Sequence, residues 1–217
     1  MSAQRYSSEQ RNRSAQRYQR RKKQKRSRLK NVIIWGLVVA VLSAAALFFA
    51  TNFEEDAKRK LLEISYPRDY SQYVDKAARE YDLDPALIYA VIRTESGFDP
   101  EARSGAGACG IMQVMPSSFD WLLEKRGMTG EYVTEDLFDP EICIDFGSYL
   151  LKYFYDYYSD ESCAIAAYNA GFVVGEWLEI SDYSPDGKSL VSTPYPETTE
   201  YIERVSSSKE MYIKLYY

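Results

Sequence analysis

The 217-residue sequence predicts a mainly α-helical protein in which a single transmembrane helix precedes one folded domain. Two observations favour this class: an uninterrupted apolar segment near the N-terminus, and helix-start signals beyond it that are followed by apolar residues spaced three to four apart. Strand-like alternation is nearly absent, although residues 181–196, with a turn at 184–187, could form a small β-hairpin. The residues after the apolar segment are enough for one domain with a hydrophobic core.

The apolar segment is long enough to cross a membrane. No charged residue lies between Lys30 and Glu54, and residues 32–50 are apolar apart from one Gly and one Ser. Such a length spans a hydrocarbon core of about 30 Å. A cleaved signal peptide is the competing interpretation, with small residues at 43–46 as the cleavage site, but Leu47 and the two Phe residues after it favour an uncleaved anchor.

The charge distribution predicts the topology. The first 30 residues hold 12 Lys and Arg and one acid, whereas the rest of the chain holds 15 basic and 31 acidic residues, a net charge of −16. By the positive-inside rule, the basic end is cytoplasmic and the acidic domain lies on the other side of the membrane. The basic segment is expected to contact anionic lipid and not nucleic acid, because it adjoins the membrane span.

We therefore expect four segments along the chain: a disordered basic tail at 1–31, a transmembrane helix at 32–53, a linker at 54–68 and a folded domain at 69–217. Within the domain, Asp84-Pro85 and Asp139-Pro140 each place an N-cap candidate before a proline at the first helical position. Further helices are expected at 117–126, at 162–170 and from 196 to the C-terminus.

The residue types limit the chemistry. The chain has no His, which excludes Ser-His and Cys-His nucleophile pairs and His-ligated metal sites. Cys109, Cys143 and Cys163 form no C-x-x-C pair, so no metal or other cofactor is expected, and their disulfide state stays open. Carboxylates and hydroxyls remain as the candidate catalytic groups.

Glu95 is the strongest candidate. It follows the apolar face of the helix that starts after Asp84, so its carboxyl group lies at a helix C-terminus beside apolar side chains. Both the helix dipole and partial desolvation disfavour the ionised form and raise the pKa toward that of a usable general acid. The stretch 104–116 then combines small residues with an embedded Gln, a composition that lets the backbone approach a ligand closely.

Four motifs occur in order: Glu95-Ser96, the stretch 104–116, the Tyr-Asn-Ala-Gly run within 167–171, and the Glu-Thr-x-x-Tyr run at 197–201. Together they resemble the lytic transglycosylases of the soluble-transglycosylase (SLT) type, which share a goose-lysozyme-like fold. The resemblance covers roughly residues 70 to 206 and implies a lysozyme-like helical domain that acts on the glycan strands of peptidoglycan without a cofactor. Protein partners remain unknown.

The resemblance also implies a role for each matching residue. Glu95 is the sole catalytic acid and base, Ser104 and Gln113 hydrogen-bond the sugar, Met112 and Met115 line the cleft, Tyr168 and Asn169 contact the sugar on the far wall, and Glu197 and Tyr201 complete the surround. For Ser104, Met112 and Asn169 the alternative is that they only shape the loop and fill space.

Three positions depart from the family's usual pattern. Cys143 stands where Asn is common, Thr199 replaces the usual Arg of the fourth motif, and Phe172 stands where Pro is frequent. Cys143 puts a buried polar hydrogen bond of the family in doubt, and Thr199 puts a salt bridge in doubt. None of them removes Glu95.

The implied reaction cleaves the bond from N-acetylmuramic acid to N-acetylglucosamine and leaves a 1,6-anhydromuramyl end. Asp99 and Glu101 lie in a polar turn and are not expected to act as a second catalytic carboxylate. The alternatives are a hydrolytic muramidase on the same scaffold, which needs that second acid, and a wall-binding module that does not cut. A structural role in a secretion or sporulation complex could coexist with catalysis, and the sequence leaves open whether cleavage is endo or exo.

Overall fold

The computed structural model describes the backbone of residues 2–217 and the side chains of residues 17–28 and 30–217. The elements in chain order are α1 (Ser2–Ser65), α2 (Ser71–Tyr81), α3 (Pro85–Glu95), α4 (Pro116–Arg126), the 3-10 helix η1 (Thr134–Phe138), α5 (Pro140–Tyr158), α6 (Glu161–Ala170), the 3-10 helix η2 (Gly171–Val173), α7 (Val174–Leu178) and α8 (Pro196–Tyr216). The chain divides into two units after Lys60. The mainly helical class is confirmed.

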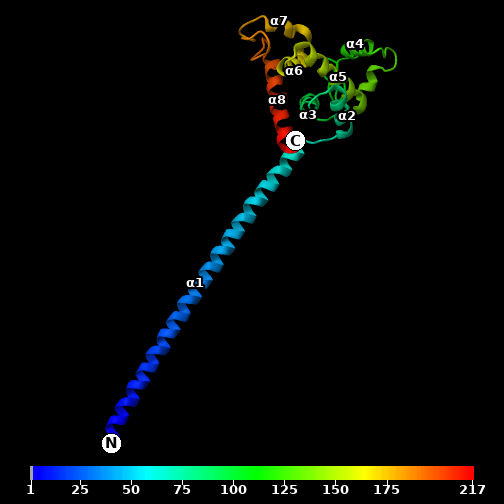
Figure 1. Cartoon of the computed structure of the whole chain (residues 1–217). Helices are drawn as coiled ribbons and strands as arrows, with labels where there is room; N and C mark the ends of the chain where they lie inside the picture. Colours follow the sequence, from blue (N-terminus) through cyan, green and yellow to red (C-terminus); the bar gives the residue numbers. More distant parts are fainter. Residues whose placement is uncertain (1) are drawn as a thin grey trace. The chain divides into compact units, whose positions relative to one another are not determined.

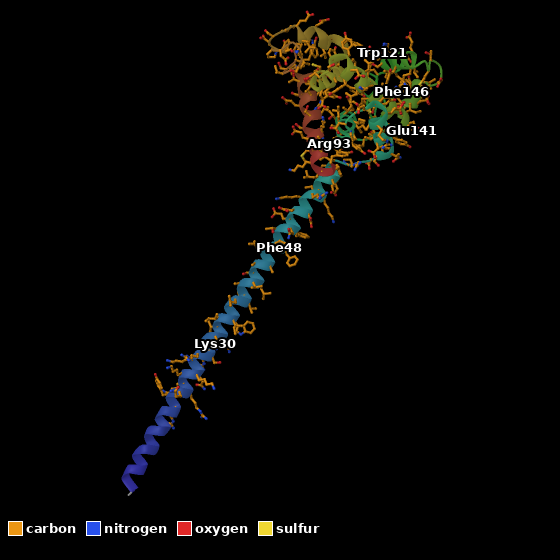
Figure 2. All side chains as sticks on the ribbon, viewed as in Figure 1. Lys30, Phe48, Arg93, Trp121, Glu141 and Phe146 are labelled. Atoms are coloured by element: carbon orange, nitrogen blue, oxygen red, sulfur yellow. The ribbon has the colours of Figure 1, made fainter. Side chains whose placement is uncertain are left out.

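The first unit is formed by α1 up to Lys60, and the middle of this helix is apolar and exposed. Trp35 and Phe48, for example, are 68% and 64% exposed, and Figure 2 labels Phe48 together with Lys30, the last charged residue before the apolar stretch. By length and composition α1 can cross a membrane. Helix α1 as described begins at Ser2 and so includes the basic segment. The division into tail, span and linker stays a prediction.

The second unit holds the helices whose starts the sequence predicts. The Asp84 side chain accepts a hydrogen bond from the Ala86 N–H (2.8 Å), and the Asp139 side chain accepts one from the Glu141 N–H (2.8 Å). Each Asp therefore caps a helix whose first residue is Pro, which has no N–H to satisfy. The expected helices at 117–126, 162–170 and 196 onward are also confirmed to within one residue at their starts.

Two parts of the second unit differ from the sequence prediction. Helix α2 is not among the predicted helices, although Val74, Ala77 and Tyr81 form a buried stripe along it. Residues 181–196 form turns, and within the described residues no strand is present; the Val191 N–H donates to the Tyr183 carbonyl at 2.9 Å, but no ladder follows. The possible hairpin is therefore not formed.

Helix α3 is the centre of the second unit. All residues from Ala86 to Ile92 are buried, so the helix is covered on every side. It packs chiefly against α8 and also against α2, while α5 packs against α2 and α6; Figure 1 shows α8 running beside α3 and α6. Phe146 of α5, labelled in Figure 2, packs edge-on against Phe119 of α4 at 4.7 Å between ring centroids. This packing brings the C-terminal end of α3, where Glu95 lies, close to α8.

Candidate active site

Glu95 is the last residue of α3, and its half-buried side chain is held by α8. The Tyr201 hydroxyl donates a hydrogen bond to Glu95 Oε1 at 2.6 Å. Burial raises the pKa of Glu95 from 4.5 to about 7, while the Tyr201 hydrogen bond and the positive charge of Arg204 act in the opposite direction. Glu95 is therefore partly protonated near neutral pH and can serve as a general acid.

Four hydrogen bonds join the four sequence motifs in a closed ring. In order round the ring they are Ser96 Oγ to the Ile111 carbonyl (2.7 Å), Tyr168 OH to the Met112 carbonyl (2.8 Å), Thr198 Oγ1 to Asn169 Oδ1 (2.9 Å) and Tyr201 OH to Glu95 Oε1 (2.6 Å). The ring ties the end of α3 to the loop 104–116, the loop to α6, α6 to α8, and α8 back to α3. Segments that are far apart in the sequence are thus brought together around Glu95.

The loop 104–116 is shaped by two of the predicted sugar-binding residues. Ser104 Oγ accepts a hydrogen bond from the Ala108 N–H at 3.0 Å. Gln113 has a left-handed backbone (φ 50°), and its side-chain amide donates to the carbonyls of Ala102 (3.0 Å) and Gly110 (2.9 Å). Both side chains therefore have a structural role, and the Gln113 amide oxygen remains as an acceptor for a ligand.

Gly110 fixes where the loop lies. Its φ is +74°, and a Cβ atom there would lie 1.9 Å from the Leu137 carbonyl oxygen and 2.9 Å from Cys143 Sγ. Only glycine fits such a close approach to η1 and α5. Beside it, Cys143 Sγ accepts the Met112 N–H at 3.4 Å, so the thiol supplies a weak bond where the family commonly has Asn. Burial raises the pKa of Cys143 to about 12 and keeps the thiol protonated.

The remaining predicted residues are distributed between core and surface. Met112 is fully buried, and its side chain packs against Gly147 of α5, which does not fit a direct contact with sugar. Met115 is 37% exposed and is the N-cap of α4, and Glu197 is exposed in the first turn of α8. Burial, together with the charge of the nearby Glu95, raises the pKa of the Tyr168 phenol well above its ordinary value, so the hydroxyl stays protonated and remains a hydrogen-bond donor.

The two other departures from the family pattern, Thr199 and Phe172, lie in different parts of the domain and make different contacts. Thr199 Oγ1 accepts the Thr193 N–H at 3.0 Å and so closes the turn before α8 in place of a salt bridge. Phe172 is 49% exposed and packs edge-on against Phe154 at 5.2 Å between ring centroids.

One residue near the site was not predicted. Arg204 lies three residues after Tyr201 on α8, which places both on one side of the helix and lets the guanidinium act on the Glu95 carboxyl. Its spacing of three residues from Tyr201 could have indicated Arg204 as part of the site.

Within the described part of the chain, no carboxylate is among the groups that shift the Glu95 pKa. Asp99 and Glu101 are exposed, and the Asp99 side chain accepts the Glu101 N–H at 3.0 Å, as expected of turn residues.

Comparison with known proteins gives concordant matches. The family model described as Transglycosylase SLT domain matches residues 72–187. The chain is 30% identical over 172 residues to the membrane-bound lytic murein transglycosylase C of Actinobacillus pleuropneumoniae serotype 5b, a match that covers 68% of this chain and 47% of the relative. It is 31% identical over 147 residues to the soluble lytic murein transglycosylase of Escherichia coli K12, with 66% and 23% covered. The chain thus spans about half the length of the first relative and about a quarter of the second.

Solved structures of lytic transglycosylases also resemble this domain. An inactive mutant of the lytic transglycosylase Slt from Pseudomonas aeruginosa superposes with a TM-score of 0.62 at 30% identity, over 71% of this chain and 25% of that one. The 70 kDa soluble lytic transglycosylase from Escherichia coli superposes with a TM-score of 0.63 at 27% identity, over 70% and 25%. The lysozyme-like helical domain expected from the four motifs is thereby confirmed.

Proposed function

Because the chain belongs to the transglycosylase SLT domain family, we propose that it is a membrane-anchored lytic transglycosylase that cleaves peptidoglycan glycan strands at the bond from N-acetylmuramic acid to N-acetylglucosamine. The observation that carries this proposal is the Glu95 carboxyl group. It has a raised pKa, it accepts a 2.6 Å hydrogen bond from Tyr201, and no second carboxylate in the described chain acts on it.

The proposed reaction needs only one carboxyl group. Protonated Glu95 donates its proton to the glycosidic oxygen, and the bond between that oxygen and muramyl C1 breaks. The resulting Glu95 carboxylate then takes the proton of the muramyl C6 hydroxyl while that oxygen forms a bond to C1. The product is a 1,6-anhydromuramyl end, no water is consumed, and Glu95 returns to its protonated form.

The surroundings of Glu95 suit both halves of this cycle. Burial favours the protonated form that starts the reaction. The Tyr201 hydroxyl and Arg204 favour the carboxylate that follows, which limits the cost of ionising a desolvated acid. Ordinary glycosidases use a second carboxylate about 5 to 10 Å away to activate water or attack the sugar. The groups that shift the pKa of Glu95 in the described chain include no carboxylate, and the proposed reaction uses the substrate's own C6 hydroxyl as the nucleophile.

Mass spectrometry of products from purified sacculi tests this function. The full chain should release muropeptides that are each lighter by one water than their hydrolytic counterparts, and a reaction in 18O-labelled water should leave them unlabelled. Glu95→Gln should bind glycan and release essentially nothing. Reducing ends that carry solvent oxygen would instead identify a muramidase, and binding without any product would identify a wall-binding module.

The membrane anchor is a separate part of the proposal. The exposed apolar stretch of α1 and the charge asymmetry on its two sides support a single-pass protein with a cytoplasmic N-terminus and an extracytoplasmic catalytic domain. Protease added to intact spheroplasts should then remove the domain and spare the basic N-terminal segment. A mature N-terminus near Leu47 would overturn the anchor in favour of a cleaved signal peptide.

A further inference from the structure

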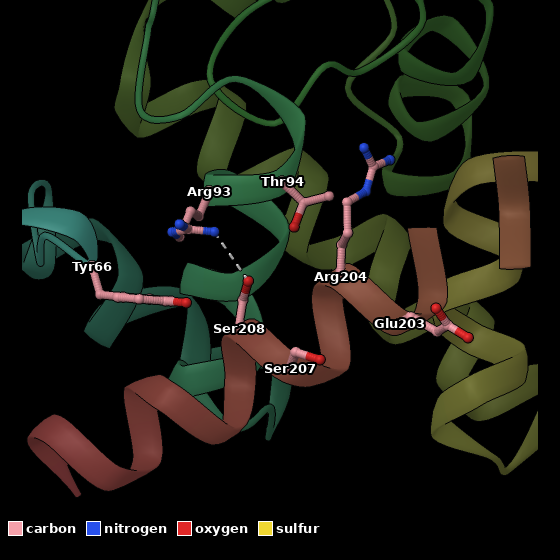
Figure 3. Close-up of a pocket in the computed structure, with 7 residues that line it drawn as sticks. All are labelled: Tyr66, Arg93, Thr94, Glu203, Arg204, Ser207 and Ser208. Atoms are coloured by element: carbon pink, nitrogen blue, oxygen red, sulfur yellow. Dashed lines mark hydrogen bonds between the residues drawn. The ribbon is translucent and has the colours of Figure 1, made fainter. Parts of the chain in front are cut away.

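A cavity of about 450 Å³ lies between α3 and α8, next to the candidate active site. The seven residues that line it are Tyr66, Arg93, Thr94, Glu203, Arg204, Ser207 and Ser208 (Figure 3). Two guanidinium groups and four hydroxyl-bearing side chains thus face one pocket. This arrangement is notable in a chain whose residues beyond the first 30 carry a net charge of −16, because such a surface repels anions over most of its area.

Arg93 forms a fixed wall of the pocket. Its Nε donates to the Ser65 carbonyl at 3.0 Å, one terminal nitrogen donates to Ser208 Oγ at 3.3 Å, and the guanidinium lies 4.1 Å from the centroid of the Tyr66 ring. Figure 3 shows the bond to Ser208 across the pocket. A guanidinium carries five N–H donors, so these contacts hold Arg93 in place and still leave donors for a ligand.

Arg204 is the available cation. Within the described residues its guanidinium makes no hydrogen bond or ion pair, and the residue is exposed. The one acid in the lining, Glu203, points away from Arg93 in Figure 3. A guanidinium with unoccupied paired donors suits the planar, two-oxygen geometry of a carboxylate.

The position of the pocket limits what its ligand can be. Thr94 lines the pocket and directly precedes Glu95, and the Arg204 charge acts on the Glu95 carboxyl. A group bound here therefore lies beside the bond that Glu95 would cleave. On a glycan strand, the substituent nearest that bond with an acidic group is the lactyl ether of the muramyl residue, which carries either a free carboxylate or a peptide with carboxylates of its own.

We propose that the pocket between α3 and α8 binds a carboxylate on the muramyl substituent, held by Arg204 against the fixed wall of Arg93, with Ser207 and Thr94 facing the attached peptide. This inference rests on the proposed function and adds to it a preference for substituted strands. Arg204 then acts in substrate binding as well as on Glu95, so the part of its loss that depends on the substrate should appear in KM.

Steady-state cleavage of three substrates by the full chain tests the pocket. They are peptide-bearing strands, strands stripped of peptide by an amidase, which expose the lactyl carboxylate, and peptide-bearing strands whose carboxylates have been converted to amides. Arg204→Gln, Arg204→Lys and the control Arg79→Gln, an exposed arginine on α2, are compared at pH 5.5. At that pH Glu95 is largely protonated, so a change in its pKa does not affect the comparison.

For Arg204→Gln we expect KM to rise about 10- to 100-fold more on the peptide-bearing strands than on the amidated strands, as for loss of a charge-assisted pair. A fall in kcat that arises from the effect of Arg204 on Glu95 should be the same for all three substrates. The KM of Arg204→Lys should fall between those of the native chain and Arg204→Gln, and Arg79→Gln should match the native chain. On the amidated strands the Arg204 variants should show no rise in KM beyond the effect that all three substrates share. A penalty confined to peptide-bearing strands assigns the site to a carboxylate of the peptide, and one that appears also on stripped strands means that the exposed lactyl carboxylate occupies the site as well.

An equal penalty on all three substrates, or none on any, would overturn the inference. The first result would mean that Arg204 acts through Glu95 or through the fold. If the native chain cleaves none of the substrates, it is the proposed function that fails. Cleavage by the native chain with no substrate-dependent effect of Arg204→Gln removes only the pocket assignment.

Discussion

Replacing Glu95 with Gln should stabilise the folded protein at alkaline pH and leave its stability at pH 4 almost unchanged. In the folded state the pKa of Glu95 is about 7 instead of 4.5, because burial disfavours the carboxylate. The folded state therefore holds this proton more tightly than the unfolded state, and the native chain loses stability as the pH rises from about 4.5 through about 7. Gln keeps the shape and can still accept the Tyr201 hydrogen bond, but it never ionises.

The size of the effect follows from the two pKa values. A difference of this size corresponds to about 3 kcal/mol at most, and partial contact of Glu95 with water reduces it to about 1 to 3 kcal/mol. Denaturant unfolding of the full chain in a non-ionic detergent, followed by near-ultraviolet circular dichroism at pH 4, 5.5, 7 and 8.5, measures it. The difference in the free energy of unfolding between the native chain and Glu95→Gln is used, because the contributions of all other titrating groups then cancel.

The control is Glu101→Gln, which removes an exposed carboxylate from the turn after α3. Its stability difference from the native chain should not vary over this pH range. A difference for Glu95→Gln that is also independent of pH, or that favours the native chain at pH 8.5, would refute the argument that Glu95 is desolvated.

Three further predictions concern the groups around Glu95. Tyr201→Phe removes the 2.6 Å hydrogen bond that favours the carboxylate, so the pKa of Glu95 should rise further, the alkaline limb of the pH-rate profile should move to higher pH, and turnover should fall about 10- to 1,000-fold. Gly110→Ala should lower the free energy of unfolding by about 2 to 4 kcal/mol, because its Cβ would lie 1.9 Å from a carbonyl oxygen, whereas Gly105→Ala, with open space around it, should change little in the same unfolding assay. Asp99→Asn should leave product release from sacculi largely intact, and a loss comparable to that of Glu95→Gln would mean that the second carboxylate has been missed.

The helices were predictable where local chemistry determines them. Asp84 and Asp139 each precede a Pro. The Asp carboxylate caps the helix and the Pro has no N–H that needs a partner, so this start signal can be recognised from the local sequence alone. Helix α2 has no comparable start: its N-cap, Tyr70, makes no side-chain cap and has a left-handed backbone. Its stability comes from packing of Val74 and Ala77 against the core, which is a tertiary effect.

The candidate site was predictable in its residue types more than in its contacts. The position of Glu95 at the end of an apolar helix correctly indicates a raised pKa. The sequence does not indicate that Met112 is fully buried, since that follows from Gly147 on α5, 35 positions further along the chain. The partnership of Tyr201 with Glu95 likewise depends on how α8 packs against α3, and Arg204 enters the site through the same packing.

The opposing effects on Glu95 explain how one carboxyl group could serve as both acid and base. A fully solvated Glu would be ionised at neutral pH and could not donate a proton, whereas a buried Glu without partners would donate it only at a high energetic cost. Burial at the end of α3 keeps the proton on Glu95, and the Tyr201 hydroxyl together with Arg204 stabilises the carboxylate once the proton has left. With the pKa near 7, neither protonation state is strongly favoured, so the same group can donate a proton and then accept one in a single cycle.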